Sequence, residues 1–218
     1  MKWYRMAADQ GDARAQVNLG FMYASGTGVV TDEAEAVKWY RLAADQGHAK
    51  AQVRLGNMYD EGKGVLKDQM KAVDWYVKAA NQGYLGAQFN LGNMYYDGRG
   101  VVRNGTKAIK WYRMAADQGH APSQSNLGAI FTTGVDVSKN VEEGLKWYRL
   151  AADQRYAPAQ AILGTRYEGG YGVVKSELTA YMWYLLARAQ GNEVARENLQ
   201  RIEKKSNARA TIQGARTS

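Results

Sequence analysis

The residues that could carry acid–base or metal chemistry are few in this 218-residue chain, and they follow a repeat. The sequence has no cysteine and two histidines, His48 and His120, which lie 72 residues apart. The lack of cysteine excludes a disulfide framework, a thiolate zinc site and a cysteine nucleophile. Four aspartates recur at multiples of 36 residues: Asp9, Asp45, Asp117 and Asp153. We therefore interpret these groups as repeat positions, with the histidines at helix starts, and expect no catalytic centre, metal or cofactor.

Motifs for phosphate binding or serine chemistry are also missing. The glycines of Gly26-Thr27-Gly28 lie between two amphipathic segments, which is typical of a helix hairpin and not of a phosphate-binding loop. No serine is followed three residues later by lysine, the pattern of serine acyl-transfer enzymes. The sequence thus predicts a protein that is not an enzyme.

Composition and charge narrow the classes of partner. Hydrophobic residues make up 45% of the chain, which is typical of a folded soluble domain, and no segment is apolar enough to span a membrane. The net charge of +8 is modest, so nucleic acid is possible but not favoured. The N-terminus lacks the apolar core of a signal peptide. We assign no compartment: the chain as given is expected in the cytoplasm, or in the periplasm or medium if a signal peptide was removed.

The scarcest large side chain sets the period of the sequence. All six tryptophans stand 36 residues apart: Trp3, Trp39, Trp75, Trp111, Trp147 and Trp183. A Leu-Gly pair recurs with the same spacing at Leu19, Leu55, Leu91, Leu127 and Leu163, and a glutamine at Gln16, Gln52, Gln88, Gln124 and Gln160. Self-similarity at a fixed period of this length indicates an array of structural repeats.

The spacing of apolar residues predicts two helices in each repeat, which we call helix A and helix B. Ala15, Leu19, Met22 and Tyr23 follow the spacing of one helix face, and Ala36, Val37, Tyr40, Ala43 and Ala44 follow that of a second. A double-glycine turn separates them. Helix B is expected to begin at a capping residue, namely Asp32, Asp68, Asn104, Asn140 or Ser176. It ends near a glycine in each repeat except at Arg155, where we expect the helix end to fray or bend differently.

Stacking of such hairpins would bury one continuous core. A lone two-helix unit leaves too much apolar surface exposed, whereas neighbouring units can cover each other. Residues like Gly20 on helix A and Ala36 on helix B allow close helix approach, and the tryptophans are expected in the core between repeats. A role for the Trp-Tyr pairs in stacking bases or sugars is the weaker alternative.

The motifs of the second repeat resemble those of a known family. With Ala-Gln-x-x-Leu-Gly-x-Met-Tyr at 51–59, Gly62-x-Gly64-Val65, Ala72-x-x-Trp75-Tyr76 and Ala79-Ala80-x-Gln82-Gly83, the chain is similar to the Sel-one-like repeat family, a relative of tetratricopeptide repeats. The resemblance covers nearly the whole chain. It implies an all-α, right-handed superhelical α-solenoid of about five to six repeats that binds proteins or peptides on the concave side, lined by helix A.

The repeat register divides the chain into seven parts. We expect a trailing helix at 1–12, full repeats at 13–48, 49–84, 85–120, 121–156 and 157–192, and a partial repeat or capping helix with a flexible tail at 193–218. The later repeats depart from the pattern at Asp136, Arg155, Pro122 and Pro158, which a left-handed turn or a first helical turn can accommodate.

Positions that change from repeat to repeat are the candidates for partner binding. The outer face of helix A carries cationic, amide and aromatic residues: Arg14, Asn18, Phe21, Lys50, Arg54, Asn57, Phe89, Asn90, Asn93 and Tyr96. We hypothesise that this face binds an extended or helical peptide, with the asparagines pairing with its backbone and the aromatics as anchors. Alternatives are solvated positions with no partner, a secreted or surface bacterial factor that engages a host protein, and a cell-wall or carbohydrate-binding module. The oligomeric state stays open.

Overall fold

A computed structural model describes the backbone of residues 2–217 and the side chains of residues 2–208. All regular structure in this part of the chain is helical. The helices are α1 (Lys2–Asp9), α2 (Ala13–Ser25), α3 (Glu33–Asp45), α4 (Ala49–Glu61), α5 (Gln69–Asn81), α6 (Leu85–Asp97), α7 (Gly105–Ala116), α8 (Ala121–Thr133), α9 (Val141–Asp153), α10 (Ala157–Gly169), α11 (Glu177–Arg188) and α12 (Glu193–Thr217). Helix A of each repeat is an even-numbered helix and helix B an odd-numbered one.

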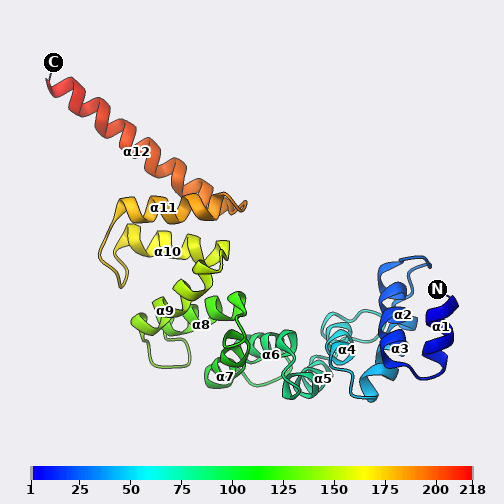
Figure 1. Ribbon diagram of the computed structural model, residues 1–218. Helices are drawn as coiled ribbons and strands as arrows, with labels where there is room; N and C mark the ends of the chain where they lie inside the picture. Colours follow the sequence, from blue (N-terminus) through cyan, green and yellow to red (C-terminus); the bar gives the residue numbers. More distant parts are fainter. Residues whose placement is uncertain (1, 218) are drawn as a thin grey trace. The chain divides into compact units, whose positions relative to one another are not determined.

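The chain forms two compact units, each a stack of helical hairpins. Unit 1 comprises residues 1–118 and unit 2 comprises residues 119–218. In unit 1, α2 pairs with α3, α4 with α5 and α6 with α7; in unit 2, α8 pairs with α9 and α10 with α11 (Figure 1). Consecutive hairpins touch within each unit, for example through α3 and α4 or α9 and α10. Stacked two-helix repeats define an α-solenoid, so the predicted fold class is confirmed.

Helix B begins at the five residues that the sequence predicts. Each has a backbone outside the helical region, and its side-chain oxygen accepts a hydrogen bond from the N–H three residues later. These bonds measure 2.8–3.1 Å at Asp32, Asp68, Asn104, Asn140 and Ser176. For Asp68, the bond from the Lys71 N–H lowers the pKa of the carboxyl group below its usual value. One capping residue per repeat therefore fixes where the loop ends and helix B begins.

Removal of one cap gives the first testable prediction. Asn104→Ala should lower the free energy of unfolding by about 1 kcal/mol, because the Lys107 N–H loses the oxygen that it contacts at 2.8 Å. Urea unfolding followed by circular dichroism measures this change. Thr106→Ala, at an exposed position of the same helix, is the matched control and should be close to neutral. Equal stability of the two variants would contradict a capping role.

The end of helix B at Arg155 differs from the prediction. Arg155 has φ +64°, in the left-handed region that Gly47 (φ +87°) occupies in an earlier repeat. The Arg155 N–H donates to the Ala152 oxygen at 2.9 Å, and the Tyr156 N–H donates to Ala151 at 3.1 Å. The expectation of a frayed or differently bent end was wrong, since hydrogen bonds hold the arginine in the strained conformation. Asp136 adopts φ +59°, as expected.

Glycine on helix A lets a tyrosine of helix B pack against the backbone. A Cβ atom added to Gly92 would lie 2.4 Å from Cδ1 of Tyr112, and one added to Gly20 would lie 2.8 Å from Tyr40. The same pairing recurs in every full repeat. The five tyrosines, Tyr40, Tyr76, Tyr112, Tyr148 and Tyr184, are no more than 3% exposed. The predicted close approach of the two helices is therefore confirmed, and the side chain that fills the space between them is a tyrosine of helix B.

The tryptophans are less buried than we predicted. Trp39 is 7% exposed, but Trp75, Trp111, Trp147 and Trp183 are only half-buried, and Trp3 is 77% exposed. The buried Trp39 donates its indole N–H to Glu35 at 3.0 Å, and the half-buried Trp147 donates to Glu143 at 2.9 Å. These bonds satisfy the polar atom of each indole.

The recurring glutamine of helix A links three helices. Gln52 Nε2 donates to the Ala44 oxygen of the preceding helix B at 3.1 Å, and its Oε1 accepts from Gln82 of the following helix B at 2.8 Å. Gln16 and Gln160 have the same two partners in their repeats. These buried amides satisfy one another, which lets polar groups hold successive helices in register.

Helix α12 lies in the last part of the chain, 193–218, where we expected a partial repeat or capping helix with a flexible tail. It runs from Glu193 to Thr217. Its first turns bury Ala195 and Leu199 against α10 and α11. The remainder of the predicted flexible tail, Ser218, lies outside the described residues.

Candidate protein-binding site

The ten predicted partner-binding residues all lie in unit 1, on three successive A helices. They divide by exposure. Arg14, Asn18, Phe21, Lys50 and Arg54 are exposed, whereas Asn57, Phe89, Asn90, Asn93 and Tyr96 are half-buried. The first group comes from α2 and the start of α4, and the second from the end of α4 and from α6. Only the exposed group can change without disturbing the packing of unit 1.

Two neighbouring cavities bring part of this set together. One, of about 240 Å³, is lined by Phe21, Arg54 and Asn57 with Tyr40 of helix B. The other, of about 210 Å³, is lined by Asn57 and Asn90 together with Asp60, Tyr76 and Arg99. Asn57 and Glu61 line both, so the cavities adjoin along α4. The structure thus joins Phe21, Arg54, Asn57 and Asn90 in one hollowed strip.

The asparagines of this strip already serve the fold. Tyr76 donates its hydroxyl hydrogen to Asn57 Oδ1 at 2.7 Å, and Asn90 Nδ2 donates to the same oxygen at 3.2 Å. Tyr112 donates to Asn93 Oδ1 at 2.6 Å. Burial raises the pKa of Tyr76 far above its usual value, so its hydroxyl stays a donor. The oxygens of Asn57 and Asn93 thus hold helix B against helix A. Pairing of the asparagines with a partner's backbone stays a prediction.

A pair of tyrosine variants tests this structural role. Tyr76→Phe should lower the free energy of unfolding by about 0.5–1.5 kcal/mol, because it removes the hydrogen bond to Asn57. Tyr40→Phe in the preceding repeat should be close to neutral, since no described side chain accepts from the Tyr40 hydroxyl. Thermal unfolding compares the two. A larger loss for Tyr40→Phe would refute this assignment.

The aromatic residues of α6 pack within unit 1. The rings of Phe89 and Tyr112 lie 6.1 Å apart in a tilted arrangement. The guanidinium of Arg103 lies 5.8 Å from the ring of Tyr96. These contacts fix both side chains at the edge of the candidate site.

Sequence reasoning missed the charged end of the second cavity. Arg99, in the loop after α6, donates to Asp60 Oδ2 at 2.7 Å and to Asp97 at 3.2 Å. Gln69 donates to the other oxygen of Asp60 at 3.0 Å. Asp60 and Arg99 are 39 residues apart, one period plus three, so the register of the loop glycines could have indicated that they meet. The network neutralises Asp60 and holds one wall of the strip.

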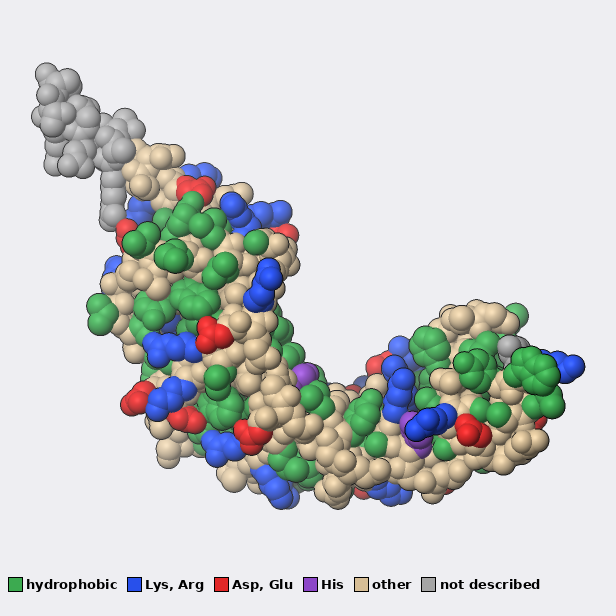
Figure 2. All heavy atoms as spheres, viewed as in Figure 1, with side chains coloured by type: hydrophobic (Ala, Val, Ile, Leu, Met, Phe, Trp, Pro, Cys, Tyr) green, Lys and Arg blue, Asp and Glu red, His purple; other side chains and the backbone are tan. Residues whose placement is uncertain are grey.

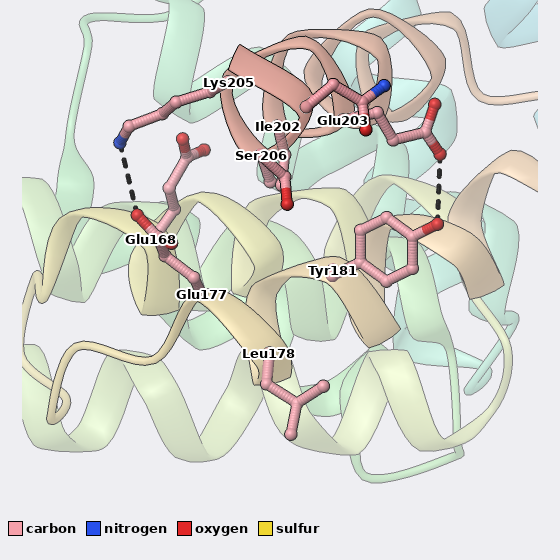
Figure 3. Close-up of a pocket in the computed structure, with 9 residues that line it drawn as sticks. Glu168, Glu177, Leu178, Tyr181, Ile202, Glu203, Lys205 and Ser206 are labelled. Atoms are coloured by element: carbon pink, nitrogen blue, oxygen red, sulfur yellow. Dashed lines mark hydrogen bonds and ion pairs between the residues drawn. The ribbon is translucent and has the colours of Figure 1, made fainter. Parts of the chain in front are cut away.

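Unit 2 contains a larger cavity, of about 460 Å³, where α12 crosses α10 and α11. Figure 3 shows its acidic side chains paired across the gap: Lys205 lies 3.2 Å from Glu177, and Tyr181 donates to Glu203 at 3.0 Å. Arg201 donates to both oxygens of Glu168, at 2.5 and 2.7 Å. These contacts bind α12 to the hairpin beneath it.

The Glu168 contact predicts a pH dependence. The bonds from Arg201 hold the pKa of Glu168 below its ordinary value of 4.5, although partial burial opposes the shift. A lowered folded-state pKa stabilises the fold above about pH 4.5, and the stabilisation is lost as the pH falls through the folded pKa. Wild type should therefore exceed Glu168→Gln in stability at pH 7, and the gap should shrink on acidification. Glu197→Gln, an exposed change on α12, the helix of Arg201, is the control. A gap independent of pH in urea unfolding would contradict the ion pair.

Metal or acid–base chemistry finds no support in the geometry. No group of three or more His, Asp or Glu side chains among the described residues could hold a metal ion. His48 and His120 stand at the starts of α4 and α8, as the sequence predicts, and His120 Nδ1 lies 2.8 Å from the Ser123 hydroxyl. None of the described helices has the length and apolar character to cross a bilayer.

The surface mixes charge with apolar side chains. Figure 2 shows basic residues interspersed with acidic and hydrophobic ones on the face in view, in both units. Nucleic-acid-binding proteins usually carry a basic stripe on one face.

Comparison with known proteins agrees with this architecture. The Sel1 repeat model matches residues 1–12, 13–48, 49–84, 86–120, 121–156 and 157–192. The protective antigen c5321 of uropathogenic Escherichia coli, which displays an SLR fold, is 37% identical with a TM-score of 0.89, over 95% of this chain and 44% of the antigen. A Sel1 repeat protein from Oxalobacter formigenes is 33% identical with a TM-score of 0.81, over 87% of this chain and 76% of its own. The chain thus spans less than half of the antigen.

A more distant similarity is to the immunity protein PA5088 of Pseudomonas aeruginosa, at 27% identity and a TM-score of 0.52, over 84% of this chain and 66% of that protein. No curated protein matches the chain. Proteins with Sel1 repeats are generally protein-interaction scaffolds and are typically non-catalytic. Because the family model matches six stretches between residues 1 and 192, and the helices follow its two-helix unit, the chain belongs to the Sel1 repeat family.

Proposed function

We propose that this protein is a non-enzymatic scaffold or adaptor that binds a peptide or protein segment along the helix-A face of unit 1. The observation that carries the proposal is the hollowed strip of two adjoining cavities, whose lining includes side chains that differ from repeat to repeat, such as Phe21, Arg54 and Asn90. Recurring residues such as Gly92 and Tyr112 pack against each other between helix A and helix B. The variable residues Phe21 and Arg54 remain exposed beside the cavities. An exposed aromatic ring and an arginine are frequent anchors of protein interfaces.

The family and its relatives support a protein partner. Sel1 repeats generally form interaction scaffolds, and one relative is described as an immunity protein. A protein partner for this chain is part of our proposal, because the chain covers less than half of the Escherichia coli antigen. We infer a peptide or protein ligand from the size of the strip and its mixture of amide, cationic and aromatic groups.

A second candidate is a surface or secreted factor that engages a host protein. The 37% identity to a protective antigen of uropathogenic Escherichia coli favours it. Protease treatment of intact cells that carry the natural protein distinguishes this candidate from an intracellular adaptor. Cleavage without lysis would support surface display, and full protection would argue against it.

The binding proposal is tested with peptides selected from a random phage library on the full chain. A face variant combines Arg14→Ser, Phe21→Ser, Lys50→Ser and Arg54→Ser, which leave the Asn–Tyr bonds intact. Fluorescence anisotropy should show at least about tenfold weaker binding, since truncating even one interface hot spot costs about 2 kcal/mol or more.

The matched control changes three cations and one apolar residue outside the face: Lys38→Ser, Leu42→Ser, Lys67→Ser and Lys110→Ser. Phe21 and Leu42 are each 48% exposed, so the two variants lose comparable apolar surface. The control should bind like wild type. Failure to select any peptide, or equal binding by both variants, would count against the proposal.

A further inference from the structure

The tyrosine of the first repeat lacks a hydrogen bond that its counterparts in three later repeats form. In the second and third repeats, the residue 19 positions before the tyrosine accepts its hydroxyl hydrogen, at Asn57 (2.7 Å) and Asn93 (2.6 Å). In the fifth repeat, Thr165 lies 3.1 Å from the Tyr184 hydroxyl. In the first repeat this position is Phe21 and in the fourth it is Ala129, and neither side chain has an acceptor. The hydroxyl of Tyr40 therefore lacks the partner that its counterparts in the second, third and fifth repeats have.

Tyr40 lines the cavity of about 240 Å³ while it is almost fully buried. Its side chain is 2% exposed, with the ring against Gly20. None of the described side chains forms a hydrogen bond with its hydroxyl. Burial raises the pKa of Tyr40, so the hydroxyl keeps its hydrogen at neutral pH. A hydroxyl donor at a cavity wall can be satisfied by a ligand.

A cation without an ion pair lies in the same cavity. Arg54 is exposed, interacts electrostatically with Tyr40 and forms no salt bridge with any side chain of residues 2–208. The acidic groups of the cavity face another cation: Lys63 lies 2.5 Å from Glu61 and also interacts with Glu33. Arg54 is thus the charge left to meet a partner.

We propose that Phe21, Tyr40 and Arg54 form a subsite for a peptide carboxylate with an apolar side chain beside it. The Tyr40 hydroxyl and the Arg54 guanidinium donate to the carboxylate, and the exposed ring of Phe21 packs against the neighbouring apolar group. Hydrogen bonds from a guanidinium to a carboxylate are charge-assisted and stronger than neutral ones. This inference rests on the proposed function, since it names the chemistry of one part of the same strip.

Substitution of Phe21 by asparagine tests the subsite most sharply. Phe21→Asn installs the acceptor found in the next two repeats, so Tyr40 should bond within its own repeat and the Tm should not fall. Peptides selected on the wild type should bind this variant and Arg54→Gln about tenfold or more weakly. Tyr40→Phe should weaken binding by a smaller factor. Lys67→Gln, an exposed lysine elsewhere in unit 1, is the control and should bind as wild type.

The probes are the selected peptides and their synthetic amides. Replacing Asp by Asn or Glu by Gln in a peptide tests a side-chain carboxylate, and amidating its C-terminus tests a terminal one. We expect acidic residues to be enriched beside apolar ones, and one of the two amides to lose affinity. Peptides without acidic enrichment, or peptides that bind Phe21→Asn and Arg54→Gln as tightly as wild type, would overturn the subsite. If the four-residue face variant still loses binding in that case, the proposed function stands and only the subsite fails.

Discussion

Replacing Gly92 by leucine is expected to lower the free energy of unfolding of unit 1 by about 1–3 kcal/mol, through overpacking. Even a Cβ atom at this position would lie 2.4 Å from Tyr112 Cδ1 and Cε1, closer than carbon atoms can approach. Tyr112 is 1% exposed, so its ring cannot swing into solvent without opening the core. The α6–α7 hairpin must therefore separate. Urea unfolding of the purified chain, followed by far-ultraviolet circular dichroism, measures the loss.

Thr106→Leu is the control for the added side chain. Thr106 is exposed on α7 of the same hairpin, so leucine there meets solvent and should change stability by less than about 0.5 kcal/mol. Gly92→Ala should lie between the two, because its single added carbon already meets the ring. An unfolding midpoint for Gly92→Leu equal to that of the wild type would show that the helices do not pack through this glycine.

The second large effect is expected in unit 2. Leu163 of α10 is fully buried with Leu145 and Tyr148 of the preceding helix B. Leu163→Ala should lower the free energy of unfolding by about 2–5 kcal/mol, the sum of lost apolar burial and of the cavity left behind. In a stacked array each repeat is stabilised by its neighbours, so the loss should extend to the adjoining hairpins of that unit. Hydrogen exchange read by mass spectrometry measures both its size and its extent.

Leu178→Ala provides the same chemical change at the surface. Leu178 is 73% exposed on α11, and its truncation should alter stability by less than about 0.5 kcal/mol. Similar losses for Leu163→Ala and Leu178→Ala would mean that the recurring leucine does not form the core between repeats.

The period of the sequence predicted most of the fold but not which aromatic residue fills the core. The 36-residue register located the hairpins, the five caps and the glycines that face a partner helix. It could not rank Trp147 against Tyr148, because adjacent residues of a helix both border its buried face. Contact with the opposing helix decides: the ring of Tyr148 covers the backbone at Gly128, while Trp147 stays half-buried and its indole nitrogen bonds to Glu143.

The same limit applies to the candidate site. Variation between repeats marked Asn57 and Asn93 as residues free to meet a partner. In the structure their oxygens accept from Tyr76 and Tyr112, across 19 residues of sequence. Periodicity compares equivalent positions in different repeats, so it does not reveal bonds between different positions of one repeat. Only when those bonds are known does Phe21 stand out as a position that lacks an acceptor for the tyrosine hydroxyl.

The glutamine ladder shows a recurring polar residue with a structural role. Its period marked Gln52 as part of the scaffold, but not its bonds to Ala44 and Gln82. A buried amide needs partners for both its oxygen and its nitrogen, and the neighbouring B helices supply them. Recurring residues thus hold the hairpins together, whether apolar or polar, and the variable exposed residues remain for binding.

The claim that recurring residues hold the fold while variable residues of helix A bind a partner is tested most directly by nuclear magnetic resonance. The measurement maps where a selected peptide contacts the isotope-labelled chain. Amide shift changes and cross-saturation should concentrate on α2, α4 and α6, around Phe21 and Arg54. A footprint confined to α3, α5 and α7, or to unit 2, would contradict the assignment of binding to the helix-A face of unit 1.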